Sequence, residues 1–245
     1  MPEPTCQLRY HPTPDELARA AAAELHALLS RRNSKIEFGV ALSGGRIAAR
    51  FYDAVVDALQ RRPAPLENVH FFWADERCVP PDSPENNFHI ARAHLFEPLG
   101  IPAASIHRIR GEVDCTYAVK EAEAELCRIM PLNPVGQPVL DLVILGMGED
   151  GHVASLFPGE PEDLVRSDAV FRHVHAVKPP PERVTLGYAP IRAAREVWVL
   201  ASGPGKKDAL EGLLRRDRTL PISRVVATHA HTVVFQDVAP HATGF

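Results

Sequence analysis

Residues 140–152 read LDLVIL and then GMGEDGH: an almost wholly apolar run, Leu140–Leu145, continues directly into a glycine-rich segment, Gly146–His152. The run has the length and apolarity of a strand buried on both faces of a sheet. Three glycines within the next six positions are incompatible with a regular helix and permit an unusual backbone path. The stretch therefore predicts a central strand that ends in a specialised loop.

Similar apolar runs alternate with helical patterns along the rest of the chain. The further predicted strands are Ile36–Leu42, Val69–Ala74, Glu196–Ala201 and Thr232–Phe235. The predicted helices are Thr13–Arg32, Ile47–Leu59, Asn87–Leu95 and Thr116–Met130. Strands that are apolar throughout and alternate with helices indicate a parallel sheet. The expected fold is α/β: a doubly wound, mostly parallel, Rossmann-like sheet with helices on both faces.

The first predicted helix carries a start signal. Thr13 and Glu16 have the form of a capping box, in which the first side chain accepts a hydrogen bond from the backbone three residues later. Pro14 occupies the favoured first helical position, and an alanine-rich amphipathic run follows. The sequence therefore predicts that this helix begins at Thr13 and Pro14.

Proline-rich stretches fall between the predicted elements and are too short to be long linkers. They are Arg62–Pro65, Pro131–Pro138 and Pro179–Pro181. The sequence contains no internal repeat and no segment of low complexity. We therefore expect a single domain over residues 1–245.

Composition and charge argue against several classes of protein. The chain has 245 residues, 45% hydrophobic and 24% charged, which is ample for a globular core. A formal net charge of −4 argues against a nucleic-acid binder, and polar residues interrupt every apolar run before membrane-spanning length. Residues 1–4 do not begin a secretory signal. We expect a cytoplasmic enzyme, monomeric or a small homo-oligomer, with neither nucleic acid nor membrane as partner.

Cysteine usage indicates neither a disulfide framework nor a thiolate metal site. The four cysteines are Cys6, Cys78, Cys115 and Cys127, and no two form a Cys-x-x-Cys pair. His152 has no histidine four residues away and no partnering cysteine, so zinc is not expected there. The sequence therefore predicts no metal site.

Four polar clusters follow directly after predicted strands: Ser43–Arg46, Asp75–Arg77, Gly146–His152 and Ser202–Lys207. In open parallel sheets, ligands bind beyond the carboxyl ends of the strands. If the strands are parallel neighbours, all four clusters lie on one rim of the sheet. Their convergence predicts one ligand site at that rim.

Some of these residues have the chemistry of an anion site. Between a strand and a helix, Gly44 and Gly45 let backbone N–H groups approach an anion, although a plain tight turn is the alternative. Arg77 can bind a phosphate through two parallel hydrogen bonds; the alternative interpretation is a surface ion pair with a neighbouring carboxylate. Arg183 and Lys206 are similar candidates with weaker cases. The turn has neither a dinucleotide fingerprint nor a P-loop, so a smaller phosphate ester fits better.

Asp150 and His152 are the candidates for catalysis. A histidine can take a proton from water at neutral pH, and a nearby carboxylate can select its tautomer and stabilise the imidazolium that forms. The alternative is a histidine that only satisfies hydrogen bonds of its loop. The sequence has no G-x-S-x-G elbow to supply a serine nucleophile. What remains is general-base chemistry with an activated water, or proton transfer on a sugar.

Three motifs resemble those of the glucosamine-6-phosphate isomerase/6-phosphogluconolactonase family, and they occur in the family's order. They are Trp73–Pro80 with Ser83, Asn86 and Asn87; Leu145–Pro158; and Lys178–Leu186. The resemblance spans about Leu42 to Val234. Its most specific part is Asp150–Pro158, where the residues after His152 favour the 6-phosphogluconolactonase branch over the deaminases.

The resemblance implies roles for individual residues. His152 is expected to act as the general base, with support from Asp150. Substrate or phosphate binding is expected from Ser43, Gly44, Gly45, Arg46, Asp75, Arg77, Asn87, Arg183 and Lys206. Arg46 is a departure, because family members usually carry a serine at this position. Its charge either compensates for the missing hydroxyl or points to solvent.

The reaction that the resemblance implies is hydrolysis of 6-phospho-D-glucono-1,5-lactone to 6-phosphogluconate, in the oxidative pentose phosphate pathway, without a cofactor. One rival is a glucosamine-6-phosphate deaminase or another sugar-phosphate isomerase, in which a carboxylate such as Asp75 moves a proton beside a carbonyl. The other is a non-catalytic sugar-phosphate sensor built on the same fold. In each case the expected partner is a small sugar phosphate.

Overall fold

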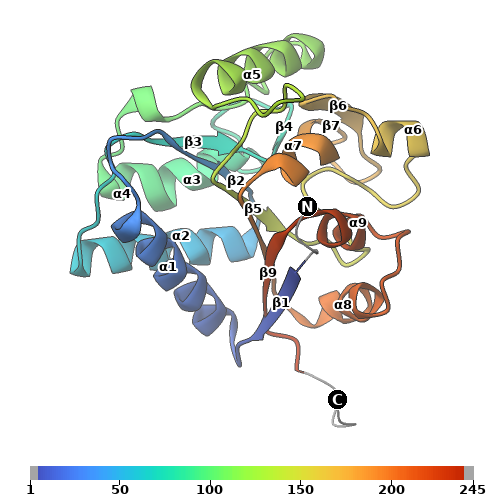
Figure 1. The fold of residues 1–245 in the computed structure, drawn as a ribbon, viewed down its shortest axis with the longest axis horizontal. Helices are drawn as coiled ribbons and strands as arrows, with labels where there is room; N and C mark the ends of the chain where they lie inside the picture. The colour runs from blue at the N-terminus through green and yellow to red at the C-terminus, as the bar shows by residue number, and fades with distance from the viewer. Residues whose placement is uncertain (1–4, 240–245) are drawn as a thin grey trace.

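A six-stranded, wholly parallel sheet forms the centre of the computed structural model, which describes residues 5–239 (Figure 1). Its strand order is β1-β9-β8-β5-β2-β3. The strands are β1 (Thr5–Tyr10), β2 (Phe38–Leu42), β3 (Val69–Trp73), β5 (Leu142–Gly146), β8 (Glu196–Ala201) and β9 (His231–Gln236). The sheet confirms the predicted α/β class. β1 is an addition, because its half-exposed, polar sequence carries no apolar run.

Helices cover both faces of this sheet. Figure 1 shows α1 and α2 on one side and α8 and α9 on the other. The helices are α1 (Pro14–Arg31), α2 (Arg46–Arg61), α3 (Asn87–Ala91), α4 (Glu97–Leu99), α5 (Cys115–Ile129), α6 (Glu162–Val165), α7 (Tyr188–Ala193), α8 (Lys207–Leu214) and α9 (Pro221–Thr228). A short π-helical turn, Arg92–Phe96, joins α3 to α4, so the helix predicted over 87–95 is irregular in its second half.

The start of α1 confirms the predicted cap. The Glu16 backbone N–H donates to Thr13 Oγ1 at 3.2 Å, and Pro14 is the first helical residue. Proline fits there because the first helical N–H has no partner within the helix. The observed helix ends at Arg31, within one residue of the prediction.

A second, three-stranded antiparallel sheet was not predicted. It consists of β4 (Asp75–Arg77), β7 (Glu182–Leu186) and β6 (Phe171–His175), in that order. Asp75–Arg77 was expected only as a polar cluster after a strand, and it instead pairs with β7 in the register Asp75↔Thr185. Three polar residues carry no strand pattern of their own, and their partner lies over 100 residues away in the sequence. Tertiary pairing therefore created this strand.

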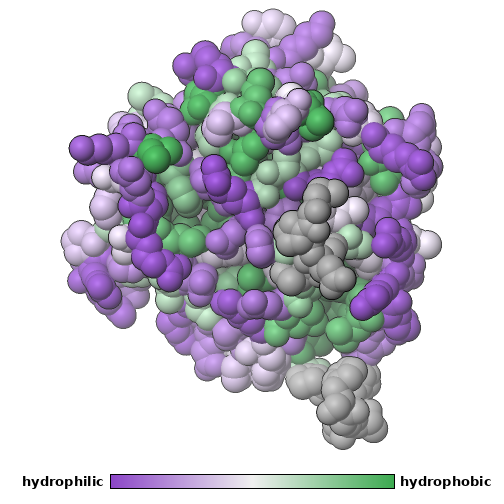
Figure 2. All heavy atoms as spheres, in the orientation of Figure 1, coloured by the Kyte–Doolittle hydropathy of each residue, from purple (hydrophilic) through white to green (hydrophobic). Residues whose placement is uncertain are grey.

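The core lies between the central sheet and its helices. Trp73 of β3 and Trp198 of β8 are fully buried, and residues 142–145 of β5 are buried at every position. Hydrophilic side chains predominate on the face shown in Figure 2, with smaller apolar patches between them. No helix within residues 5–239 is long and apolar enough to span a membrane. Residues 1–4, which bear on the secretory signal, and residues 240–245 of the expected domain lie outside the described residues.

Candidate active site

A cleft of about 840 Å³ opens at the carboxyl ends of the central strands. β2 pairs with β3 on one side and with β5 on the other, and the connections that leave β2 and β8 run to helices on opposite faces. Such a switch in direction leaves a crevice in which open α/β sheets bind ligands. Residues from all four polar clusters line the cleft, so the structure brings them together as the strand pattern predicted.

Ser43 ties the two central strands together at the floor of the cleft. Its Oγ–H donates to the Ile144 carbonyl at 2.8 Å, and the Tyr52 hydroxyl donates to the Ser43 carbonyl. Ser43 is 5% exposed. Because the Ser43 hydroxyl already donates its proton to the Ile144 carbonyl, it is not free to donate a hydrogen bond to a phosphate. Its place in the structure favours holding the turn in shape.

Gly44 and Gly45 have separate physical reasons to be glycine. A Cβ on Gly44 would lie 1.8 Å from Asn87 Oδ1, so the backbone passes too close to that amide for any side chain. Gly45 has φ +96°, a conformation that other residues rarely adopt, and α2 begins at the next residue. The unpaired N–H groups of the first turn of α2 therefore adjoin the cleft, where they favour an anion.

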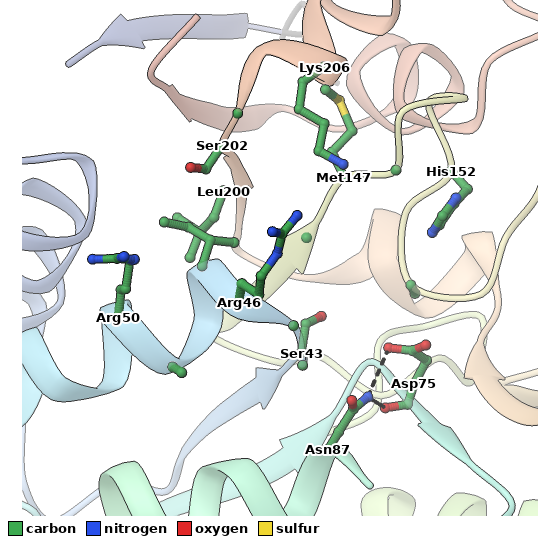
Figure 3. A pocket seen from close by; sticks show the side chains of 18 of the residues that line it. Ser43, Arg46, Arg50, Asp75, Asn87, Met147, His152, Leu200, Ser202 and Lys206 are labelled. Carbon is green, nitrogen blue, oxygen red and sulfur yellow. Dashed lines mark hydrogen bonds between the residues drawn. The ribbon is translucent and has the colours of Figure 1, made fainter. Parts of the chain in front are cut away.

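Asn87 and Asp75 form a buried polar contact in the wall of the cleft. Asn87 Nδ2 donates to the Asp75 carbonyl at 2.8 Å and lies 3.5 Å from Asp75 Oδ1 (Figure 3). Asp75 Oδ2 accepts a hydrogen bond from Ser155 Oγ at 2.7 Å. Asn87 Oδ1 is buried without a hydrogen-bond partner among the described residues, which leaves one acceptor beside the cleft.

Glu76 fixes the start of α3 beside this wall. Its fully buried carboxylate accepts backbone N–H bonds from Arg77, Asn87 and Phe88 at 2.7–2.9 Å. Burial raises the pKa of Glu76 to about 8, although the three donors act in the opposite direction. This role of Glu76 is not visible in the sequence, because a carboxylate that accepts the N–H groups of a helix eleven residues away leaves no local pattern.

The cleft is rich in cations, and the side chains of two of them have neither an ion pair nor a hydrogen bond to another described residue. Arg50 is paired with Asp15, and Arg77 donates to the Glu85 carbonyl at 2.8 Å. Within residues 5–239, neither Arg46 nor Lys206 forms an ion pair, and both line the cleft (Figure 3). Burial lowers the pKa of Lys206, and the charge of Arg46 contributes in the same direction. Two unpaired cations at one cleft provide an attraction for an anionic group.

Arg77 and Arg183 stand directly opposite each other in the β4–β7 ladder. Arg183 is only 6% exposed, and its guanidinium donates to the Pro180 carbonyl at 3.0 Å and the Lys178 carbonyl at 3.1 Å. Burial lowers the pKa of Arg183, and the charge of Arg77 lowers it further. Like charges opposite each other destabilise a sheet, so this pair favours an anion between or beside the two side chains.

Asp150 and His152 form a hydrogen-bonded pair on the loop after β5. The loop is closed by Gly148 N–H donating to the His152 carbonyl at 2.8 Å, and Gly151 takes a positive φ of +80° at the turn. His152 Nδ1 lies 2.6 Å from Asp150 Oδ1, which also accepts the His152 backbone N–H at 3.2 Å. Burial opposes ionisation of Asp150, but the adjacent imidazole and these donors hold its pKa below the ordinary value.

This pairing determines which nitrogen of His152 can act as a base. An ionised carboxylate accepts a hydrogen bond and cannot donate one, so Nδ1 must carry the proton and Nε2 keeps its lone pair. His152 lines the cleft (Figure 3), whereas Asp150 lies outside its lining and supports the imidazole through the Nδ1 hydrogen bond. The Phe157 ring packs 4.9 Å from the imidazole, centroid to centroid, and limits its movement.

The structure adds cleft residues that sequence reasoning did not single out. Arg50, Met147, Ala154, Leu200 and Ser202 all line the cleft. Helical periodicity from Arg46 could have placed Arg50 on the same face one turn later. Met147 and Ser202 lie inside two of the predicted clusters, whereas Ala154 and Leu200 had no signal apart from their positions beside those clusters.

The fold and the cleft define an α/β protein with a cationic pocket and a carboxylate-supported histidine. Residues 12–234 match the family described as glucosamine-6-phosphate isomerases/6-phosphogluconolactonase. The chain belongs to this family, which confirms the resemblance that its motifs indicated.

Individual relatives bear the name 6-phosphogluconolactonase. That of Treponema pallidum is 35% identical over 200 residues, which cover 80% of this chain and 80% of the relative. That of Mycobacterium bovis is 39% identical over 149 residues, so the match covers 58% of this chain and only 59% of that relative. The solved structure of 6-phosphogluconolactonase from Trypanosoma brucei superimposes with a TM-score of 0.81 at 28% identity, covering 95% of this chain and 96% of the other.

Proposed function

We propose that this chain hydrolyses 6-phospho-D-glucono-1,5-lactone to 6-phosphogluconate, the step of the oxidative pentose phosphate pathway after which its relatives are named. The observation that carries the proposal is the Asp150–His152 pair in a cleft that also holds the unpaired cations Arg46 and Lys206. The cations can bind the phosphate group of the substrate, and the histidine can activate a water next to the ester carbonyl at the other end of the six-carbon chain.

The proposed reaction begins with proton transfer from water to His152 Nε2. The resulting hydroxide attacks the lactone carbonyl and forms a tetrahedral oxyanion, while the ionised Asp150 stabilises the imidazolium. The bond between the carbonyl carbon and the ring oxygen then breaks, and the imidazolium returns its proton to that oxygen. One water is consumed and the product carries a new carboxyl group, without a cofactor.

The oxyanion needs hydrogen-bond donors placed where its charge develops. Two sources adjoin the histidine in this structure. The guanidinium of Arg183 lies over the Phe157 ring at 5.8 Å, and the same ring packs against His152. The backbone N–H groups of the loop after β5 are the second source. We favour Arg183, because it carries a full positive charge and is held in place by its two backbone acceptors.

The rival chemistry would use Asp75 as the base for an isomerase or deaminase reaction. Its Oδ2 already accepts a hydrogen bond from the buried Ser155, and Asn87 lies against its other oxygen. These contacts hold the carboxylate in the wall of the cleft and reduce its freedom to abstract a proton. Hydrolysis therefore has the stronger geometric support, and ammonia release from glucosamine 6-phosphate tests the rival directly.

The test is lactone turnover with the purified protein. The lactone is generated by oxidation of glucose 6-phosphate, its disappearance is followed over time, and the spontaneous rate is subtracted. We expect catalysis by the native chain and a loss of about 100- to 10,000-fold in kcat for His152→Ala. The matched control is His231→Ala, an exposed histidine at the opposite end of the sheet, which should retain activity. Turnover at the spontaneous rate, as expected of a non-catalytic sensor, would contradict the proposal.

A further inference from the structure

A second group of reactive side chains lies on the face of the small sheet that is turned away from the cleft. Successive residues of a strand point to opposite faces. Arg183 of β7 faces the cleft, so its neighbour Glu182 faces the other way. Cys78 follows β4 and continues the same ladder, because its N–H donates to the Glu182 carbonyl at 2.8 Å. Cys78 and Glu182 are therefore cross-strand neighbours.

Two histidines of β6 complete the row on this face. His173 and His175 are two residues apart and therefore point the same way, and His175 stands opposite Glu182 in the ladder. Each imidazole binds one oxygen of the Glu182 carboxylate, His173 through Nε2 and His175 through Nδ1. The hydrogen bonds to both histidines lower the pKa of Glu182, so its carboxylate is ionised at neutral pH.

Cys115 reaches the same row from a different element. It is the first residue of α5, which lies over β6 and β7 (Figure 1). Its Sγ, one ring nitrogen of His173 and one carboxylate oxygen of Glu182 all lie within 4.8 Å of one another. Cys78, the cross-strand neighbour of Glu182, adjoins this trio.

We propose that Cys115, His173 and Glu182 bind a zinc ion or another divalent ion of similar softness. A thiolate with an imidazole and one carboxylate is a zinc donor set, whereas magnesium and calcium prefer oxygen ligands alone. Zinc ligands at about 2.0–2.3 Å from the metal in a tetrahedral arrangement lie roughly 3.3–3.8 Å apart. Because the three atoms lie within 4.8 Å of one another, the Cys115 sulfur has to come closer by at most about 1–1.5 Å, whereas the hydrogen-bonded His173 and Glu182 have to separate. Rotation of these exposed or half-buried side chains supplies both movements.

Binding exchanges hydrogen bonds for metal bonds. The Cys115 thiol loses its proton to solvent, and His173 Nε2 or Nδ1 binds the ion while Glu182 turns one oxygen from the imidazole to the metal. The fourth position is filled by water or by the Cys78 thiol. Such an ion would fasten the start of α5 to the β6–β7 hairpin, directly behind the strand that carries Arg183.

The experiment measures zinc binding to the purified, reduced protein after treatment with a chelator. Isothermal titration with zinc chloride should give one ion per chain with micromolar or tighter affinity. Cobalt in place of zinc should give a thiolate-to-metal absorption band. A free-thiol assay beforehand shows whether Cys78 and Cys115 are reduced. An absent heat of binding with all four thiols free, or a cobalt spectrum without the thiolate band, would overturn the proposal.

Matched variants assign the ion to this site. Loss of a residue that only hydrogen-bonds a metal ligand typically costs about 10- to 100-fold in affinity. Cys115→Ser and His173→Gln remove a ligand itself, so each should weaken zinc binding by more than that. Cys127→Ser on the same helix should leave the affinity within a few-fold. His175→Gln removes only an outer contact to Glu182 and should therefore cost no more than about 10- to 100-fold. His152→Ala should bind zinc normally, which separates this site from the cleft. Circular dichroism checks that each variant is folded. Unchanged affinity in folded Cys115→Ser would refute the assignment.

Discussion

Replacing Gly148 by alanine tests the geometry of the catalytic pair with a single methyl group. An added Cβ would lie 2.0 Å from His152 Nδ1, 2.3 Å from its Cε1 and 2.5 Å from Asp150 Oδ1. The imidazole would have to move back by about 1.4 Å to reach the 3.4 Å of an ordinary van der Waals contact. The Phe157 ring, 4.9 Å away between centroids, restricts the positions to which the imidazole can move.

A displacement of about 1 Å at a catalytic group costs on the order of 100-fold in rate. We therefore expect Gly148→Ala to lower kcat for the lactone about 100-fold, equivalent to about 2.7 kcal/mol of barrier. KM should change little, because the cations of the cleft are untouched. The half-exposed loop can absorb the strain, so the midpoint of chemical denaturation should fall only slightly.

The assay is lactone turnover at several substrate concentrations, to separate kcat from KM. Gly146→Ala is the control, because a Cβ there would meet only the Gly44 carbonyl at 3.9 Å, an ordinary contact. It should lose much less activity than Gly148→Ala. Equal activity of Gly148→Ala and the native chain would show that the Asp150–His152 arrangement does not set the rate, and would refute this reasoning.

Three further predictions concern binding, pH and local structure. Arg46→Ser removes an unpaired cation from the cleft and should raise KM about 3- to 10-fold with little change in kcat; an unchanged KM would place this charge outside the substrate site. Arg108 lowers the pKa of Glu112 from 4.5 to about 2, so its contribution to stability is complete above pH 4.5 and is lost as pH falls toward 2. Glu112→Gln should therefore lower the free energy of unfolding by about 1 kcal/mol at pH 7 and by much less at pH 2; an undiminished difference at pH 2 in urea titrations would contradict this. Thr13→Ala removes the acceptor for the Glu16 N–H and should cost about 1 kcal/mol in the same titrations, with an unchanged midpoint as the contrary result.

The sequence predicted most of the central sheet because its strands are uniform along their length. A run such as Leu142–Leu145, buried on both faces, is apolar at every position and needs no knowledge of its partners. The same reasoning placed the polar clusters at strand ends and led to His152. It could not reveal β4, because the three polar residues Asp75–Arg77 become a strand only through pairing with β7.

The roles of the cleft residues likewise depend partly on chemistry that the sequence shows and partly on contacts that only the structure shows. The chemical type of a residue, such as the histidine and carboxylate of Gly146–His152, is visible in the sequence. Whether a side chain is free to use that chemistry depends on its neighbours. Ser43 resembled a phosphate ligand, yet its hydroxyl proton is engaged by Ile144. Arg183 was predicted as a phosphate ligand with a weaker case than Arg77, and only the structure shows that it is buried opposite Arg77.

The sequence alone thus determined the fold class, the family and the segment that holds the candidate base, because local hydrophobic patterns and contiguous motifs encode all three. Tertiary structure alone decided which cations stay unpaired, that Arg183 stands opposite Arg77, and that Cys115 meets His173 and Glu182. These are contacts between residues far apart in the chain. Spacing along the sequence carries no information about them, since packing of whole elements sets their distances.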